Sequence, residues 1–148
     1  MTTPKILNPR GTSDILPEEA FLWQDTETKA RQLLTVYGYR EIRTPYFEET
    51  SLFVRSLGQT SDVVEKQMLN LSSARHAETV ESKDSTLSLR PEATAGIVRS
   101  YLQNDLDKKE HLSKLYTIGP MFRGERPQKG RLRQFHQIGV EVIGRESS

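Results

Sequence analysis

Two stretches of alternating side chains, residues 114–123 and 131–144, constrain the fold more than any other feature of the chain. They read "KLYTIGPMFR" and "RLRQFHQIGVEVIG", and a short segment rich in glycine, proline and basic residues separates them. Because successive side chains point to opposite faces of a strand, this pattern predicts two long strands that pair as an antiparallel hairpin. The chain is therefore expected to fold around a sheet.

The second stretch divides by parity into two different faces. Its even positions run through His136 to Ile138, Val140 and Val142, so this face becomes apolar, whereas the odd positions stay largely polar. If the apolar faces pack on helices, the opposite face is an open polar platform. That platform would carry Arg123, Arg131, Arg133, Phe135, Gln137 and Glu141.

Helices and shorter strands are predicted ahead of the hairpin. Apolar residues at helical spacing, bounded by proline, glycine and acidic residues, predict helices at 16–38, 50–58 and 91–106. Strand patterns occur at 39–45, 65–72 and 86–91, and the small polar residues of 72–85 predict a loop. This order favours an α+β domain with a mostly antiparallel sheet flanked by helices.

Composition limits the chemistry that the platform can support. The 148 residues are one domain's worth of chain, and the formal charge of +1 makes local charge clusters more informative than the total. There is no cysteine and the three histidines lie far apart, so no metal site is predicted. The first residues lack the apolar run of a signal peptide or a membrane span, and we expect a cytoplasmic protein without membrane contact.

The residue types on the platform favour a nucleotide as its ligand. A solvated sheet face is the simplest alternative, but Gly139 in mid-strand weakens a sheet and is typical of a close approach by a ligand. An aromatic ring among arginines offers a surface for a purine, and guanidinium groups bind phosphate oxygens in pairs. Gln137 and Glu141 are unusual among the contacts of a long nucleic-acid backbone.

Two carboxylates add a second kind of chemistry near the arginines. Glu92 and Glu141 are compatible with general acid–base catalysis, with surface salt bridges, or with binding of a cationic ligand. Glu92 also has a purely structural explanation, because an acid in the first turn of a helix interacts favourably with the helix dipole. The residues alone leave these alternatives open.

Four segments resemble the histidyl-tRNA synthetase family of class II aminoacyl-tRNA synthetases. "RGTSDILPEE" is similar to the family's opening signature, and "GYREIRTPYFEETSLFVRSLGQTSDVVEKQM" to its motif 1 region. "LSLRPEATA" resembles the family's "RPEGTA" segment, and "GPMFRGERPQKGRLRQFHQIGVEVIG" its motif 2 strand–loop–strand. The resemblance implies that residues 1–148 are the amino-terminal portion of the catalytic domain, with motif 1 at about 18–68 and motif 2 at about 113–144.

The resemblance also implies a role for each platform residue. Arg123 would be the catalytic arginine that contacts the ATP α-phosphate and the histidine carboxylate, and Glu141 would recognise the imidazole ring. Glu125, Arg131 and Phe135 would join Arg123 in binding ATP. Histidine would be bound by Glu92, Ala93, Thr94, Arg123, Gln137 and Glu141, and the tRNA acceptor end would be contacted by Arg126 and Gln128.

The implied reaction is activation of L-histidine with ATP to histidyl-adenylate, followed by transfer to tRNA(His). ATP would act as a substrate with Mg2+, no metal would be ligated by the protein, and the motif 1 region would form a homodimer. The alternative is the synthetase-like regulatory subunit of ATP phosphoribosyltransferase, a non-catalytic paralogue that is not expected to keep both "RPExT" and the arginine-rich loop. A general RNA-binding module would not need Glu92, Gln137 and Glu141.

The chain departs from the family pattern in several places. Ala93 replaces the glycine of "PEGTA", which is expected to be tolerated if the local backbone is helical. Gln59 and Gln67 stand where acids are common, and 72–85 is longer than usual. The family's motif 3 and anticodon-binding domain are absent from residues 1–148, so these residues alone are expected to be weakly active or inactive.

Overall fold

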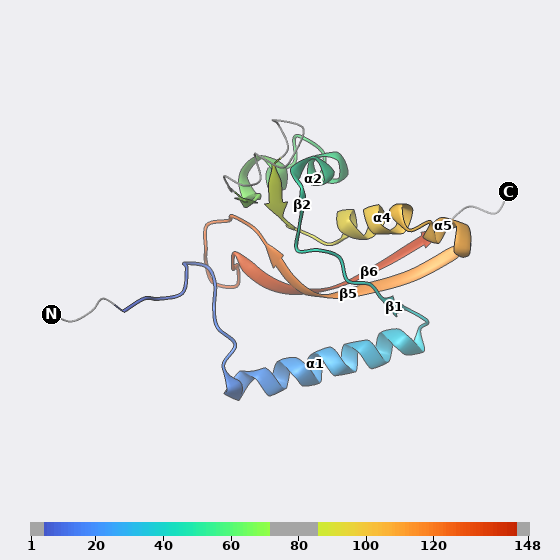
Figure 1. The fold of residues 1–148 in the computed structure, drawn as a ribbon. Helices are drawn as coiled ribbons and strands as arrows, with labels where there is room; N and C mark the ends of the chain where they lie inside the picture. Colours follow the sequence, from blue (N-terminus) through green and yellow to red (C-terminus); the bar gives the residue numbers. More distant parts are fainter. Residues whose placement is uncertain (1–4, 72–85, 145–148) are drawn as a thin grey trace.

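A long, curved hairpin of β5 (Leu112–Phe122) and β6 (Gln134–Gly144) forms the centre of the molecule (Figure 1). It is seen in a computed structural model that describes residues 5–71 and 86–144. Helix α1 (Pro17–Val36) runs along one side of the hairpin and α4 (Thr94–Gln103) along the other (Figure 1). The predicted hairpin is confirmed, and the predicted loop at 72–85 lies outside the described residues.

The strands form two three-stranded sheets. In the first, β1 (Arg40–Glu41) runs parallel to β5, and β5 pairs with β6 in an antiparallel register. In the second, β4 (Leu87–Leu89) lies between β2 (Phe47–Glu49) and β3 (Asn70–Leu71), and both pairings are antiparallel. The prediction of an α+β fold with mostly antiparallel sheets is confirmed, because β1–β5 is the only parallel pair among the described strands.

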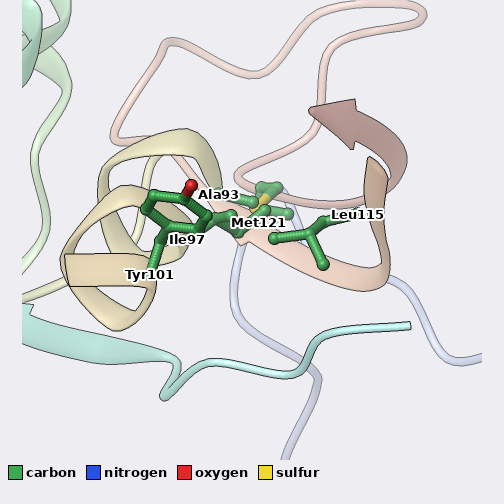
Figure 2. Packing of buried hydrophobic residues seen from close by; sticks show 5 residues of the cluster. All are labelled: Ala93, Ile97, Tyr101, Leu115 and Met121. Carbon is green, nitrogen blue, oxygen red and sulfur yellow. The ribbon is translucent and has the colours of Figure 1, made fainter. Parts of the chain in front are cut away.

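The hydrophobic core lies between α4 and the odd-numbered face of β5. Ile97 and Tyr101 of α4 pack with Leu115 and Met121 of β5, and Ala93 joins them from the residue before the helix (Figure 2). Burial of such side chains contributes about 1.5–3 kcal/mol each to folding. Because the register places Met121 opposite Phe135, this core is on the same face as the predicted platform.

The expected division into one packed face and one open polar face is therefore wrong. Helix α4 packs over the platform face, where β5 contributes apolar Leu115 and Met121. On the other face, the apolar side chains Ile138, Val140 and Val142 of β6 remain about half exposed among the described residues. Parity groups the side chains correctly, but it does not show which group a helix will cover.

Helix α1 begins at Pro17, as predicted, and carries Glu18 and Glu19 in its first turn. None of its residues is buried, and large apolar side chains such as Leu33 are more than half exposed. The helix contacts the even face of the sheet, where the ring of Trp23 lies 4.7 Å from that of His136. Most of its apolar stripe is thus left uncovered in this structure.

Three other expectations need adjustment. Helix α2 (Thr50–Leu57) ends before Gly58 as predicted, but 65–72 is not a single strand. A π-helical turn, η1 (Val63–Gln67), precedes β3, and an ion pair of 2.8 Å between Lys66 and Asp62 accompanies this turn. Residues 131–133 belong to the loop before β6, and a short helix, α5 (Leu106–Lys109), follows α4.

Within the described ranges, no helix combines the length and the apolarity that a membrane span requires.

Candidate functional site

The loop between β5 and β6, residues 123–133, is built around a tight turn. Gln128 N donates to Arg131 O over 3.3 Å, and Arg131 N donates to Gln128 O over 2.9 Å. Gly130 has a φ of +80°, a conformation that favours glycine, and this permits the reversal. The turn brings Arg131 back toward Glu125, where their side chains form an ion pair of 3.6 Å.

Arg123 stands where β5 ends and the loop begins. Its backbone N–H donates to Arg133 O over 2.8 Å, and its Nε donates to Pro91 O over 3.1 Å. Its guanidinium carbon lies 5.1 Å from the centre of the Phe135 ring. These contacts fix the position of a cation beside an aromatic ring, as a cation–π interaction does.

A cavity of about 330 Å³ opens beside this arginine. It is lined by Arg123, Glu125, Gly130, Arg131, Leu132 and Phe135. Two guanidinium groups against one carboxylate give the cavity a net positive lining, and one aromatic ring is available for stacking. Such a lining suits a ligand that combines a planar ring with phosphate groups.

An acidic cluster, formed by Glu92 and Glu141 and joined through Thr94, lies further along the same face of β6. Thr94 Oγ1, at the start of α4, donates to Glu141 Oε1 over 2.5 Å. Glu92 accepts from Thr94 N over 2.6 Å and from Ala95 N over 3.0 Å, so its carboxylate caps the amino end of α4. This capping delays the helix to Thr94, although the sequence pattern suggests a start at residue 91.

The cavity and the acidic cluster are joined by one row of side chains. Phe135, Gln137, Gly139 and Glu141 alternate with residues of the other face, so all four share the platform face. A Cβ atom built at Gly139 would meet only Thr117 Cγ2, at 3.7 Å, so the protein itself leaves the space above this residue open. Six residues of strand span about 20 Å from Phe135 to Glu141.

The remaining predicted site residues lie in different surroundings. Arg126 and Gln128 are exposed on the loop. Ala93 has φ of −100° and ψ of −24°, a right-handed helical conformation that accommodates the methyl group as expected. That methyl group lies in the hydrophobic core with Ile97 and Met121.

Sequence reasoning missed Arg90, which organises the base of the site. Arg90 is 2% exposed, donates to Pro120 O over 3.0 Å and to Thr44 O over 3.3 Å, and lies 4.5 Å from the centre of the Tyr46 ring. Burial lowers the pKa of its guanidinium, and no carboxylate of the described residues pairs with it. An arginine directly after the predicted strand residues "LSL" was the available signal.

The geometry agrees with the catalytic core of a class II aminoacyl-tRNA synthetase, and comparison with known proteins defines the family. The model of the family described as "Histidyl-tRNA synthetase" matches residues 11–148. The chain therefore belongs to the histidyl-tRNA synthetase family.

Individual relatives support this assignment. A protein of Moorella thermoacetica named histidine–tRNA ligase is 52% identical over 92% of this chain and 30% of its own length. One of Dictyoglomus turgidum with the same name is 50% identical over 93% of this chain and 32% of its own. The chain thus spans about a third of the length of the curated relatives that it matches.

Solved structures share the fold. Apo histidyl-tRNA synthetase of S. aureus superposes with a TM-score of 0.71 at 40% identity, covering 96% of this chain and 30% of that one. A Bacillus halodurans protein described as an ATP phosphoribosyltransferase regulatory subunit/histidyl-tRNA synthetase gives 0.74 at 25% identity, covering 99% and 34%. The fold is therefore similar to structures described with either function.

Proposed function

We propose that this chain is the amino-terminal part of the catalytic domain of a histidine–tRNA ligase. The whole protein would activate L-histidine with ATP and transfer the histidyl group to tRNA(His). The observation that carries the proposal is one row of side chains on one face of the hairpin, which runs from Arg123 and the aromatic-lined cavity to the hydrogen bond between Thr94 and Glu141. The names of the relatives at 49–52% identity support the ligase over the regulatory subunit, whose likeness is more distant.

In the first step, a carboxylate oxygen of histidine attacks the α-phosphorus of ATP and pyrophosphate leaves. No general base is required for this attack, because the carboxylate is already ionised at neutral pH. Arg123 would stabilise the negative charge on the α-phosphate and orient the attacking carboxylate. In the second step, a ribose hydroxyl at the end of tRNA(His) attacks the histidyl carbonyl and AMP leaves.

The cavity supports the ATP-binding roles. Phe135 would stack on adenine, and Glu125 and Arg131, which form an ion pair across the loop, would contact the nucleotide. ATP would enter with Mg2+, which supplies charge neutralisation at the phosphates. The described residues contain no group of three histidine, aspartate or glutamate side chains that could hold a metal ion.

The acidic cluster supports the histidine-binding roles. Glu92 and Thr94 would bind the α-ammonium group with Gln137 beside them, and Glu141 would recognise the imidazole. Although Glu92 accepts two backbone hydrogen bonds, each carboxylate oxygen has two lone pairs and can also accept from an ammonium. Ala93 would contribute to this cluster through its backbone, because its side chain is in the core.

Two exposed surfaces support the proposed contacts with tRNA and with a second copy of the chain. Arg126 and Gln128 are exposed on the loop, which suits contact with the acceptor end of tRNA. The uncovered apolar side chains of α1 suit a homodimer interface in the motif 1 region. We propose a cytoplasmic location, consistent with the place of protein synthesis.

The direct test is histidine-dependent ATP–pyrophosphate exchange by the full-length protein. Arg123→Ala should lower kcat by about 100-fold to 1,000-fold, as expected when a group that stabilises the transition state is removed. Arg55→Ala, at an exposed arginine of α2, is the control and should retain exchange. A wild-type protein without histidine-dependent exchange would refute the ligase function and favour the regulatory subunit.

A further inference from the structure

A short turn near the beginning of the described chain, residues 8–12, is held by its own hydrogen bonds. Thr12 N donates to Pro9 O over 3.1 Å, and Thr12 Oγ1 donates to the same oxygen over 2.8 Å. Asn8 Nδ2 donates to Thr12 O over 2.6 Å. Gly11 within this turn has a φ of +89°, which favours glycine. The turn is therefore a defined structure instead of a trailing end.

This turn is attached directly to the loop that carries Arg123 and Glu125. Gly11 O accepts hydrogen bonds from Arg133 N over 2.7 Å and from Gln134 N over 3.3 Å. Arg133 O in turn accepts from Arg123 N over 2.8 Å, and Arg133 Nε donates to Glu125 O over 3.2 Å. One residue, Arg133, thus links the turn to two predicted ATP-binding residues.

The contact is too close for any side chain at position 11. A Cβ atom on Gly11 would lie 2.8 Å from Arg133 Cγ and 2.9 Å from Pro127 Cγ. Pro127 and Arg133 stand on opposite limbs of the loop, before and after its tight turn. A methyl group at position 11 would therefore meet a side chain from each limb, and at least one of these side chains must move.

We propose that the turn at residues 8–12 positions the ATP-binding loop, with Gly11 and Arg133 as its positioning residues. The inference rests on the proposed function, because the loop is assigned to ATP by that proposal. The turn fixes the loop from one side through Gly11, while Gln67 O accepts from Gly124 N over 2.6 Å and fixes it from another. The turn itself contributes no group to the cavity lining.

The full-length Gly11→Ala variant tests this role in ATP–pyrophosphate exchange. A displacement of about 1 Å can cost up to about 100-fold, so kcat/KM for ATP should fall by about 10-fold to 100-fold. KM for histidine should change little, because α4 and β6 hold Thr94 and Glu141 independently of the loop. A general loss of folded protein would instead lower kcat without changing either KM.

A matched control is available in Gly38→Ala. Gly38 has a similar φ of +79°, but a Cβ atom there would meet nothing within 4 Å. This variant carries the same backbone strain without the contact, and it should keep the wild-type KM for ATP. Arg133→Ala is a second variant, and it introduces no backbone strain. It removes the hydrogen bond to Glu125 O and should raise KM for ATP, as Gly11→Ala should.

Limited trypsin digestion gives a readout that does not depend on catalysis. The loop offers exposed cleavage sites after Lys129 and Arg131. Cleavage there should be several-fold faster in Gly11→Ala than in the wild type or in Gly38→Ala.

The outcomes separate the two proposals. Absence of exchange in the wild-type protein would refute the ligase function, and the trypsin rates would still decide whether the turn holds the loop. Normal exchange in the wild type, together with wild-type KM for ATP and wild-type cleavage in both Gly11→Ala and Arg133→Ala, would overturn the positioning role. If Gly11→Ala does not fold, Asn8→Ala, which removes the hydrogen bond that closes the turn, decides the role of the turn, and Arg133→Ala decides the role of the Arg133 side chain.

Discussion

The hydroxyl group of Thr94 donates a hydrogen bond of 2.5 Å to Glu141, a residue 47 positions later in the chain. This contact joins the amino end of α4 to the platform face of β6, and it orients a carboxylate that would otherwise rotate freely. Both residues are assigned to histidine in the proposed function. Their contact therefore holds the acidic cluster in place without a ligand.

Replacing Thr94 should affect histidine more than ATP. Thr94→Val removes the hydroxyl at nearly constant volume, and loss of a hydrogen bond to a charged group costs about 1.5–3 kcal/mol, or about 10-fold to 100-fold in KM for histidine. Thr94→Ser keeps the hydroxyl and should stay near the wild type. Exchange assays in which histidine or ATP is varied measure the two KM values. An equal rise in both would contradict a role of Thr94 specific to histidine.

Replacing Gly139 should leave the fold intact but should weaken histidine binding at the site. In Gly139→Ala the new methyl group meets only Thr117, at an ordinary contact distance, so thermal unfolding should be unchanged or slightly improved. The same methyl group would occupy the open space between Gln137 and Glu141, and KM for histidine should rise. A variant with an unchanged KM would show that no ligand approaches this glycine.

Arg90 should be important for stability. Arg90→Met leaves the carbonyl groups of Pro120 and Thr44 without this donor, and each buried unpaired group costs about 1–3 kcal/mol. Urea denaturation should show a lower midpoint, while Arg55→Met at an exposed position should change the unfolding free energy by less than about 0.5 kcal/mol. Equal midpoints for the two variants would argue against a structural role for Arg90.

Glu41 should make a small contribution to stability that depends on pH. The hydrogen bond from Arg43 lowers the pKa of this carboxyl below its ordinary value of 4.5, with a smaller effect from Arg31. Because the folded pKa is lower than the unfolded one, the stabilisation is present above pH 4.5 and is lost as the pH falls through the folded pKa. For a partly exposed ion pair it amounts to about 1 kcal/mol or less.

The measurement compares the unfolding free energies of the wild type and Glu41→Gln between pH 7 and pH 3. The difference should be largest at pH 7 and should shrink in acid. In an Arg43→Ala background the same substitution should have a smaller effect at pH 7. A difference that does not vary with pH would exclude titration of Glu41 as its origin.

The uncovered face of α1 predicts self-association. Leu33 is 58% exposed, so Leu33→Glu should leave the unfolding midpoint nearly unchanged but should weaken a dimer formed through this helix. Leu102→Glu makes the same change at a similarly exposed leucine of α4 and is the control. Sedimentation of the full-length protein would report the difference, and a dimer unaffected by Leu33→Glu would place its interface elsewhere.

The sequence specified the hairpin well because strand parity is a local property. It correctly grouped Phe135, Gln137 and Glu141 on one face, and the register confirms that grouping. Parity does not reveal which face a distant helix covers, so the packing of α4 over Met121 was not foreseen.

Side-chain capping and long-range contacts account for the other differences. The start of α4 is shifted by the local Glu92 cap, whereas the contact of Gly11 with Arg133 joins residues more than 100 positions apart. The buried environment of Arg90 likewise depends on three separate segments of chain. Neither periodicity nor composition encodes such contacts.

The strand β6 also fixes the spacing between the side chains on its platform face. Side chains on one face recur every second residue, so the separation between the ring of Phe135 and the carboxylate of Glu141 can change only in steps of about 7 Å. Inserting or deleting a single residue between them would turn one end of the row to the opposite face. Under the proposed roles, the backbone of β6 therefore sets the distance between the ring that would stack on adenine and the carboxylate that would recognise the imidazole. A substitution at either position changes the group there without changing that distance.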